Sequence, residues 1–226
     1  MFQNAIMYTG PQVGLLCSFL GKRVLDGDVD AIKALYRTTW KEHPALIKTI
    51  TQLQECITSV EIDKDSEEKY CTEFLYYWGM ICIGDLSTLI SRDLGTANHC
   101  FDKIVHRVPK AKARLAFIQL LKSDEPAKSD RNVESIDILR QWAGRGDLFS
   151  RIVLAKISFY QFLNERQMDD ANLPMRVLRL LEPPCQKGHP VAIRFWNEII
   201  DYSGATMDTA SRMSETYIQE HILFDL

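Results

Sequence analysis

A short phrase that recurs along the chain constrains its fold more than any other feature of the sequence. Residues 146–150 read Gly-Asp-Leu-Phe-Ser, and residues 188–192, which start 42 positions later, read Gly-His-Pro-Val-Ala. Both phrases place a glycine first, a polar residue second and a small residue last. Periods of this length are typical of stacked helix pairs, in which each pair buries its apolar face against the next one. The recurrence therefore predicts a helical array.

The apolar residues predict that helices make up nearly all of the chain. They recur mostly at intervals of three and four, and alternating β-branched runs are few, so we predict an all-α fold. Asp, Pro and Gly residues that suit helix ends mark the boundaries. The predicted helices span residues 11–25, 28–42, 44–60, 67–83, 93–107, 109–122, 132–144, 147–165, 174–182, 189–202 and 206–223. The pair Pro183-Pro184 is expected to end the ninth of them.

Small and apolar residues occupy equivalent places at four predicted helix junctions. The residue that opens the later helix is small in each case: Ala45, Ala111, Ser150 and Ala192. Fourteen positions earlier there is always an apolar residue: Ala31, Ala97, Ile136 and Leu178. Small side chains let two helices approach closely. The later anchors are 39 and 42 residues apart, but the first interval is 66, so the array is predicted to be irregular over residues 50–90.

The segment from Tyr77 to Ala116 resembles the SEL-like repeat, a longer relative of the tetratricopeptide repeat. The matching residues are Tyr77-Trp78-Gly79 and Gly84, then Arg92-Asp93, Ala97 and Phe101, then Ala111 and Leu115-Ala116. Partial matches follow Leu20-Gly21, Ile138 and Leu178. The chain departs from the pattern at Arg107, Ile136, Leu178 and Pro183-Pro184. An unrelated α-helical fold remains the alternative.

This resemblance implies a superhelix of antiparallel helix pairs that acts as an adaptor or scaffold. We predict one repeat domain over residues 1–226, in which residues 206–226 form a helix that caps the end of the stack. The chain has 226 residues, of which 46% are hydrophobic, so it carries enough apolar surface for one elongated core.

Composition argues against several classes of partner. The formal net charge is −3, which gives no overall positive field to attract nucleic acid or anionic lipid. The apolar run over residues 14–20 is too short to span a bilayer, and the N-terminus lacks the pattern of a secretory signal. The six cysteines are irregularly spaced and form no CxxC pair, which favours a reducing compartment. We therefore predict a cytoplasmic protein that binds neither nucleic acid nor membrane.

No motif for catalysis or for a cofactor is present, so we predict a non-enzymatic protein without a catalytic residue, cofactor or metal. One alternative is a metal site. His99, Asp102 and His106 are spaced so that a single continuous helix would present them on one face. A solvated polar face is the favoured interpretation of the same spacing.

The expected function is to bind a protein partner in a groove lined by successive repeats. The groove would be formed by the helices predicted over residues 67–83, 109–122, 147–165 and 189–202. Tyrosine and arginine are frequent anchors of protein interfaces. The candidate partner-binding residues are Tyr77, Lys112, Arg151, Lys156, Tyr160 and Arg194. The alternative is an immunity protein that blocks the active site of a toxin or effector, and the sequence leaves the oligomeric state open.

Overall fold

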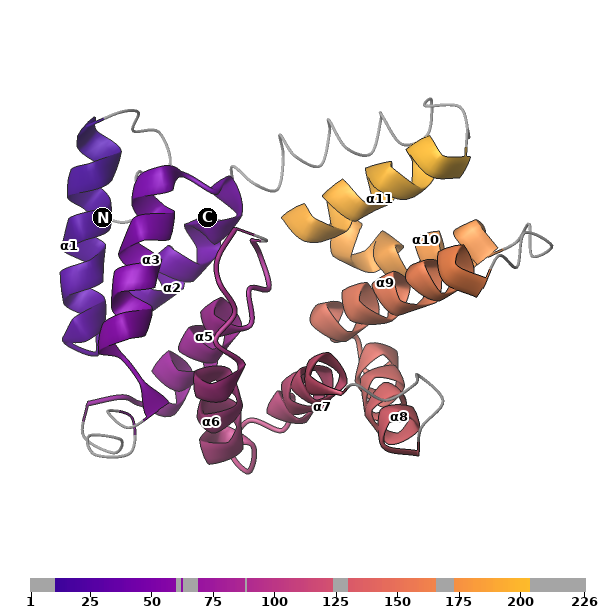
Figure 1. The fold of residues 1–226 in the computed structure, drawn as a ribbon, viewed down its shortest axis with the longest axis horizontal. Coiled ribbons are helices and arrows are strands. Elements are labelled where there is room, and N and C mark those ends of the chain that lie inside the picture. Colours follow the sequence, from indigo (N-terminus) through magenta and orange to yellow (C-terminus); the bar gives the residue numbers. More distant parts are fainter. Residues whose placement is uncertain are drawn as a thin grey trace. The chain divides into compact units, whose positions relative to one another are not determined.

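The fold is helical throughout the part of the chain that the computed structural model describes, which is residues 11–59, 62, 69–87, 89–123, 130–165 and 173–203 (Figure 1). These residues form ten α-helices and a short 3-10 helix, and none of them forms a strand. The all-α prediction is confirmed for them. The predicted capping helix over residues 206–226 lies outside the described residues.

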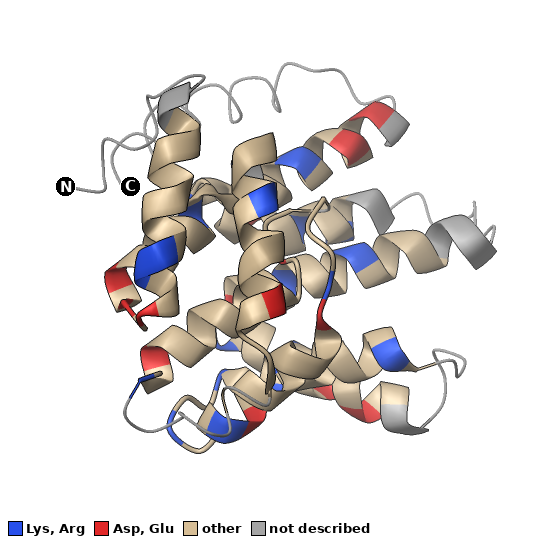
Figure 2. Ribbon diagram, turned by 60° about the vertical axis from the view of Figure 1, so that its left-hand side comes forward, with Lys and Arg blue, Asp and Glu red and all other residues tan. Residues whose placement is uncertain are grey.

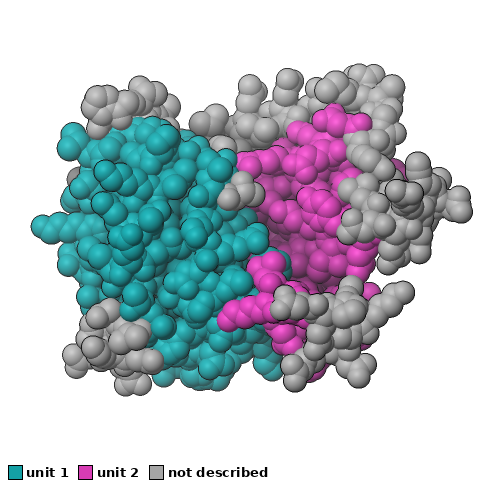
Figure 3. All heavy atoms as spheres, in the orientation of Figure 1, with its two compact units in different colours: residues 1–118 teal, residues 119–226 magenta. Residues whose placement is uncertain are grey.

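The chain divides into two compact units, residues 1–118 and residues 119–226 (Figure 3). The boundary falls within α7 (Ala111–Lys122). Each unit is described by itself below, and the single repeat domain and the superhelix stay predictions. No helix in the described part of the chain is both long and apolar enough to cross a membrane.

Unit 1 is a set of helices that pack mainly against their neighbours in the chain. Its elements are α1 (Pro11–Leu25), α2 (Val29–Thr38), η2 (Thr39–Lys41), α3 (Pro44–Cys56), α5 (Thr72–Cys82), α6 (Leu94–Ile104) and the first part of α7. Helix α1 packs on α2 and α3, α2 packs on α5, and α5 packs on α6. Trp78, Phe74 and Phe101 are fully buried in this unit, so aromatic side chains of α5 and α6 fill its centre.

The described residues of unit 2 form the end of α7 and four further helices, α8 (Asp130–Gly144), α9 (Leu148–Glu165), α10 (Leu173–Gln186) and α11 (Pro190–Ser203). Among these four, each packs against the next one in the chain. The core lies between α9, α10 and α11 and is apolar. Its buried members include Ile152, Ala155, Phe159, Val177, Leu181, Ala192, Phe195 and Ile199.

The recurring phrase of the sequence corresponds to a recurring turn in unit 2. Gly146 and Gly188 have φ angles of 89° and 69°, values that glycine adopts without a steric penalty. In each turn the glycine N–H donates to the carbonyl three residues earlier, and the next N–H donates to the carbonyl five residues earlier, at 2.9 to 3.0 Å. This is the Schellman pattern that ends a helix. The two phrases therefore form equivalent turns, each of which ends one helix and precedes the next.

The small residues after these turns are buried. Ser150 and Ala192 both have 0% of their surface exposed, which explains why the sequence places small side chains there. Ser150 is buried without cost to its hydroxyl, because its Oγ donates to the Asp147 carboxylate at 2.6 Å. Ala45, the first anchor of the predicted series, is only half-buried. Ala111, the second anchor of the series, is 0% exposed, so three of the four anchors are buried.

Helix α10 corrects one expectation from the sequence. Pro183 and Pro184 were expected to end it, but the helix continues through both of them to Gln186. A proline lacks an N–H, yet its fixed φ suits a helix and its carbonyl still accepts a bond. The N–H groups of Lys187 and His189 donate to the carbonyls of Pro183 and Pro184, at 3.2 and 2.9 Å. The prolines therefore sit in the last turn, where their carbonyls help to cap the helix.

Residues 83–87 and 89–93 join α5 to α6, and they overlap the end of the segment over residues 50–90 where the array is predicted to be irregular. Three polar bonds from different elements hold this loop. The Tyr36 hydroxyl donates to Asp85 at 2.6 Å, the Ser87 hydroxyl donates to Glu42 at 3.0 Å, and the Gln54 amide donates to the Ser91 carbonyl at 2.9 Å. The loop is thus anchored to α2, to the segment after η2 and to α3.

Replacing Tyr36 by phenylalanine should lower the free energy of unfolding by about 2 kcal/mol, because the Asp85 carboxylate loses a short hydrogen bond. Burial, together with the nearby Asp85 charge, raises the pKa of the Tyr36 hydroxyl well above its ordinary value of 10. A raised pKa adds stability below pH 10, and that stability is lost as the pH rises further. Urea unfolding should therefore show that the free energy of unfolding falls more steeply above pH 10 in the wild type than in the variant. Equal stabilities at pH 7 would contradict the anchoring role.

The six cysteines are all free thiols, and their burial predicts their reactivity. Cys56 and Cys71 are exposed, whereas the other four are buried. Burial raises the pKa of the Cys185 thiol to about 12, which lowers the fraction of reactive thiolate. Iodoacetamide should therefore modify two cysteines in the folded protein and six in urea, as counted by mass spectrometry. Rapid modification of Cys185 without denaturant would contradict the packing of unit 2.

Candidate functional site

The six residues predicted to bind a partner fall in both units. Tyr77 and Lys112 belong to unit 1, whereas Arg151, Lys156, Tyr160 and Arg194 belong to unit 2. Only the residues within one unit can be compared with one another. The four residues of unit 2 are therefore the ones whose mutual arrangement is informative.

Tyr77 lies in an aromatic cluster of unit 1 and is half-buried. Its ring is 5.4 Å from the Tyr36 ring and 5.6 Å from the Tyr76 ring, and Lys33 Nζ lies 6.0 Å from its centre. These contacts indicate that its main role is packing between α2 and α5. Lys112 is exposed on α7.

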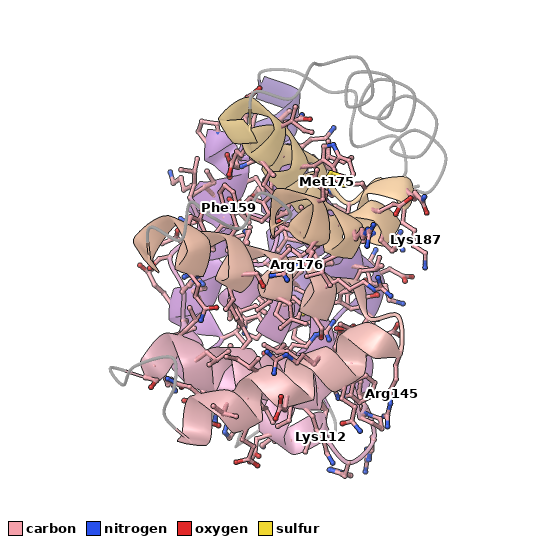
Figure 4. The ribbon with its side chains drawn as sticks, turned by 90° about the vertical axis from the view of Figure 1, so that its right-hand side faces the viewer. Lys112, Arg145, Phe159, Met175, Arg176 and Lys187 are labelled. Carbon is pink, nitrogen blue, oxygen red and sulfur yellow. The ribbon has the colours of Figure 1, made fainter. Side chains whose placement is uncertain are left out.

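Two of the predicted residues meet around Phe195 in unit 2, and we call this surface the α9–α11 seam. The Tyr160 ring stacks on the Phe195 ring at 6.2 Å with an angle of 29°, and Lys156 Nζ lies 5.9 Å from the same ring. Phe159, labelled in Figure 4, packs edge-on against Phe195 at 5.6 Å. Phe195 is buried but Tyr160 is 51% exposed. The seam thus presents an exposed tyrosine on a rigid aromatic support.

The other two predicted residues of unit 2 lie apart from this contact. Arg151 is half-buried, and its Nε donates to the Ala143 carbonyl at 3.2 Å, which ties α9 to the end of α8. Arg194 is exposed, whereas the adjacent Phe195 is buried, so the two side chains leave α11 in different directions. Arg151 therefore contributes to the fold by joining α9 to the end of α8.

A second surface of unit 2 is hollowed, and the sequence did not single it out. The hollow has a volume of about 380 Å³ and lies between α8, α9 and α10, so we call it the α8–α10 hollow. Its lining residues are Val133, Ile136, Arg140, Leu154, Ile157, Ser158, Gln161 and Leu180. Five of these eight side chains are apolar. Volumes of 300 to 1,000 Å³ with a mostly apolar lining are typical of ligand and side-chain pockets.

Helical spacing explains how two of the helices form this surface. The lining residues of α8 are Val133, Ile136 and Arg140, which follow one another at intervals of three and four. Those of α9 lie between Leu154 and Gln161 with the same spacing. Each helix therefore contributes one face. Ile136 was noted only as a repeat anchor; in the structure it is half-buried, and Val133 is 43% exposed.

Basic residues border the α8–α10 hollow. Arg140 lines it and pairs with Asp137 on α8 at 2.8 Å, with both side chains more than half exposed. Arg151 lies one turn before Leu154 on α9, and Arg176 lies one turn before Leu180 on α10, where Figure 4 labels it. Elsewhere acidic and basic residues are interspersed along the helices in the view of Figure 2. The register therefore places two further arginines near the lining of the hollow, in addition to the Arg140–Asp137 pair.

The alternative metal site does not assemble. Helix α6 ends at Ile104, so His106 lies in the following turn and does not continue the face that carries His99 and Asp102. Within the described residues, no three histidine, cysteine or acidic side chains come together as a metal would require. The spacing that suggested the site depended on a longer helix.

The function is inferred from the two surfaces of unit 2, the α9–α11 seam and the α8–α10 hollow. No protein-family model, curated protein or solved structure matches the chain.

Proposed function

We propose that the chain is a binding module that holds a segment of a protein partner in the α8–α10 hollow. The observation that carries this proposal is a hollow of about 380 Å³ among the described residues, whose lining is mostly apolar. Burying a Leu-sized side chain there is worth about 1.5 to 3 kcal/mol. Two such anchors, with polar contacts at the rim, would give a specific but reversible complex.

The lining supports binding at low ordering cost. Ile136, Leu154 and Leu180 are at least half-buried, and all of them belong to helices that pack on their neighbours. A pre-formed surface loses little conformational entropy when a partner binds. The polar groups of Ser158 and Gln161 lie among these apolar side chains and can bond to the backbone or to polar side chains of the partner. An apolar lining that includes a few polar groups is common in binding pockets.

The test fills the hollow with a bulky side chain. In Val133→Trp the indole replaces a 43% exposed side chain of the lining, so the fold should tolerate the change. Met175→Trp is the matched control, because Met175 is 56% exposed on α10 and does not line the hollow. Proteins captured from extracts of the producing cell by the immobilised wild-type chain would be identified and then titrated as purified components.

We expect Val133→Trp to weaken binding of a captured partner at least tenfold and Met175→Trp to change it less than twofold. Equal binding by both variants would remove the hollow from the proposal. A single stoichiometric client that is an enzyme, inhibited on binding, would favour the immunity-protein alternative, whereas several unrelated clients would favour an adaptor.

The α9–α11 seam requires a separate variant. Tyr160→Ala changes the exposed tyrosine of the seam and leaves the bond of Arg151 to the Ala143 carbonyl in place. An Arg151→Glu change would lose that bond, so a loss of binding in this variant could result from a loss of folding. Loss of binding in the seam variant but not in Val133→Trp would move the partner site from the hollow to the seam.

A further inference from the structure

We infer that the segment held in the α8–α10 hollow is an acidic amphipathic helix of the partner. This inference rests on the proposed function and adds the chemical class of the partner. Two features of the hollow point to it, the shape of its apolar lining and the sign of the charges on its border.

The shape favours a helical segment. The lining of α9 extends from Leu154 to Gln161 and that of α8 from Val133 to Arg140, so each extends over two helical turns. The hollow runs between two such faces. An amphipathic helix presents apolar side chains at positions i, i+3 or i+4, and i+7 over a similar length, and helices commonly bind in grooves of this kind. An extended strand would need an exposed sheet edge to satisfy its backbone groups, and the described residues form no sheet.

The charges favour an acidic segment. Arg140 lines the hollow, and the register places Arg151 and Arg176 on its border, one on each of the two other helices. The acidic residue on the same face of α8 is Asp137, which pairs with Arg140. The basic residues therefore outnumber the acidic ones, although the whole chain carries a net charge of −3. Glu or Asp on the flanks of a bound helix would meet complementary charge, which contributes to both binding rate and specificity.

The pair between Arg140 and Asp137 does not cancel this preference. Its side chains are 66% and 61% exposed, and exposed pairs contribute roughly 0 to 1 kcal/mol. An incoming carboxylate can therefore share the Arg140 guanidinium, which offers five N–H donors. Arg176 lies on α10, one turn before the lining residue Leu180.

Three synthetic peptides of ~16 residues test the inference with the full-length chain. The first is an amphipathic helix with leucines on one face and glutamates on its flanks. The second has lysines in place of the glutamates, and the third has the composition of the first in a scrambled order. Binding is measured by fluorescence anisotropy of labelled peptides at about 0.1 M and 0.5 M NaCl, salt levels that differ in charge screening.

We expect the acidic helix to bind at least about tenfold more tightly than the lysine peptide, and the difference to shrink at high salt. The double variant Arg140→Glu with Arg176→Glu should abolish this preference. Arg179→Glu is the matched control, because Arg179 is exposed on α10 but lies about a quarter turn away from Leu180. It should change the preference less than twofold.

Three results would overturn the inference. They are equal binding of the acidic and lysine peptides, a preference that survives the double variant, and binding of the scrambled peptide as tight as that of the acidic helix. Binding of none of the peptides, together with a natural partner that Val133→Trp loses, would reject the acidic helix while keeping the hollow as the site. If a natural partner binds Val133→Trp normally, the proposed function itself fails, whatever the peptides do.

Discussion

Replacing Gly79 by valine is expected to lower the free energy of unfolding by about 3 kcal/mol. Gly79 is buried in α5, and a Cβ atom there would lie 2.8 to 3.1 Å from three ring atoms of Phe101 on α6. Phe101 is itself fully buried, so its ring has no free space into which to move. The two helices would have to separate, which costs packing along their contact. Urea unfolding followed by circular dichroism measures the change.

Gly14→Val is the matched control for this prediction. Gly14 also lies within a helix of unit 1, but a Cβ atom there would meet no neighbouring atom within 4 Å. Valine forms helices slightly better than glycine, so the control should change the free energy of unfolding by less than about 0.5 kcal/mol. Combining Gly79→Val with Phe101→Leu should recover part of the loss, because the smaller side chain relieves the clash. A loss of similar size in both valine variants would show that helix propensity, and not the contact with Phe101, sets the cost.

Phe195→Ala should destabilise unit 2 by about 3 to 4 kcal/mol. Phe195 is 2% exposed and belongs to the core between α9, α10 and α11. Its removal leaves a cavity and takes away the ring on which Tyr160 stacks and beside which Lys156 lies. The α9–α11 seam should therefore lose its order together with the core, as amide hydrogen exchange across α9 and α11 would reveal.

Tyr160→Ala separates the seam from the core. It removes the exposed member of the stack and leaves Phe195 in place, so we expect a loss of about 1 kcal/mol or less. Phe195→Leu, which keeps most of the buried volume, should fall between the two. If Phe195→Ala cost no more than Tyr160→Ala, the described packing of α11 on α9 would be wrong.

Local signals in the sequence accounted for most of the helices. The predicted ranges 11–25 and 109–122 differ from α1 and α7 by two residues or fewer at each end. Helix ends depend on nearby residues, such as Asp28, which accepts a bond from the Ala31 N–H. The glycine turns also depend on nearby residues, so the sequence could predict them. The error at Pro183-Pro184 arose because the sequence shows that both residues lack an N–H, but not that their carbonyls accept bonds from Lys187 and His189.

The candidate site was harder to predict because it depends on how helices pack. Lys156 and Tyr160 were chosen as interface residues, and the structure brings both to Phe195. Arg151 has the same residue type as an interface anchor, but its bond to the Ala143 carbonyl follows from the approach of two helices. The α8–α10 hollow requires faces from three helices, and no single stretch of sequence contains that information. The residue types therefore suggested candidate interface residues, and the structure shows how far each of them is exposed.

The matching turns at Gly146 and Gly188 have a consequence for how such a chain can change in length. Each turn closes one helix and precedes the next with backbone bonds among neighbouring residues. If a helix pair were inserted at either glycine, the residues of the glycine turn would therefore cap both of its ends. Duplication of one 42-residue segment is thus a short mutational path to a longer protein, whereas an insertion of a few residues inside α9 would rotate every side chain beyond it out of register.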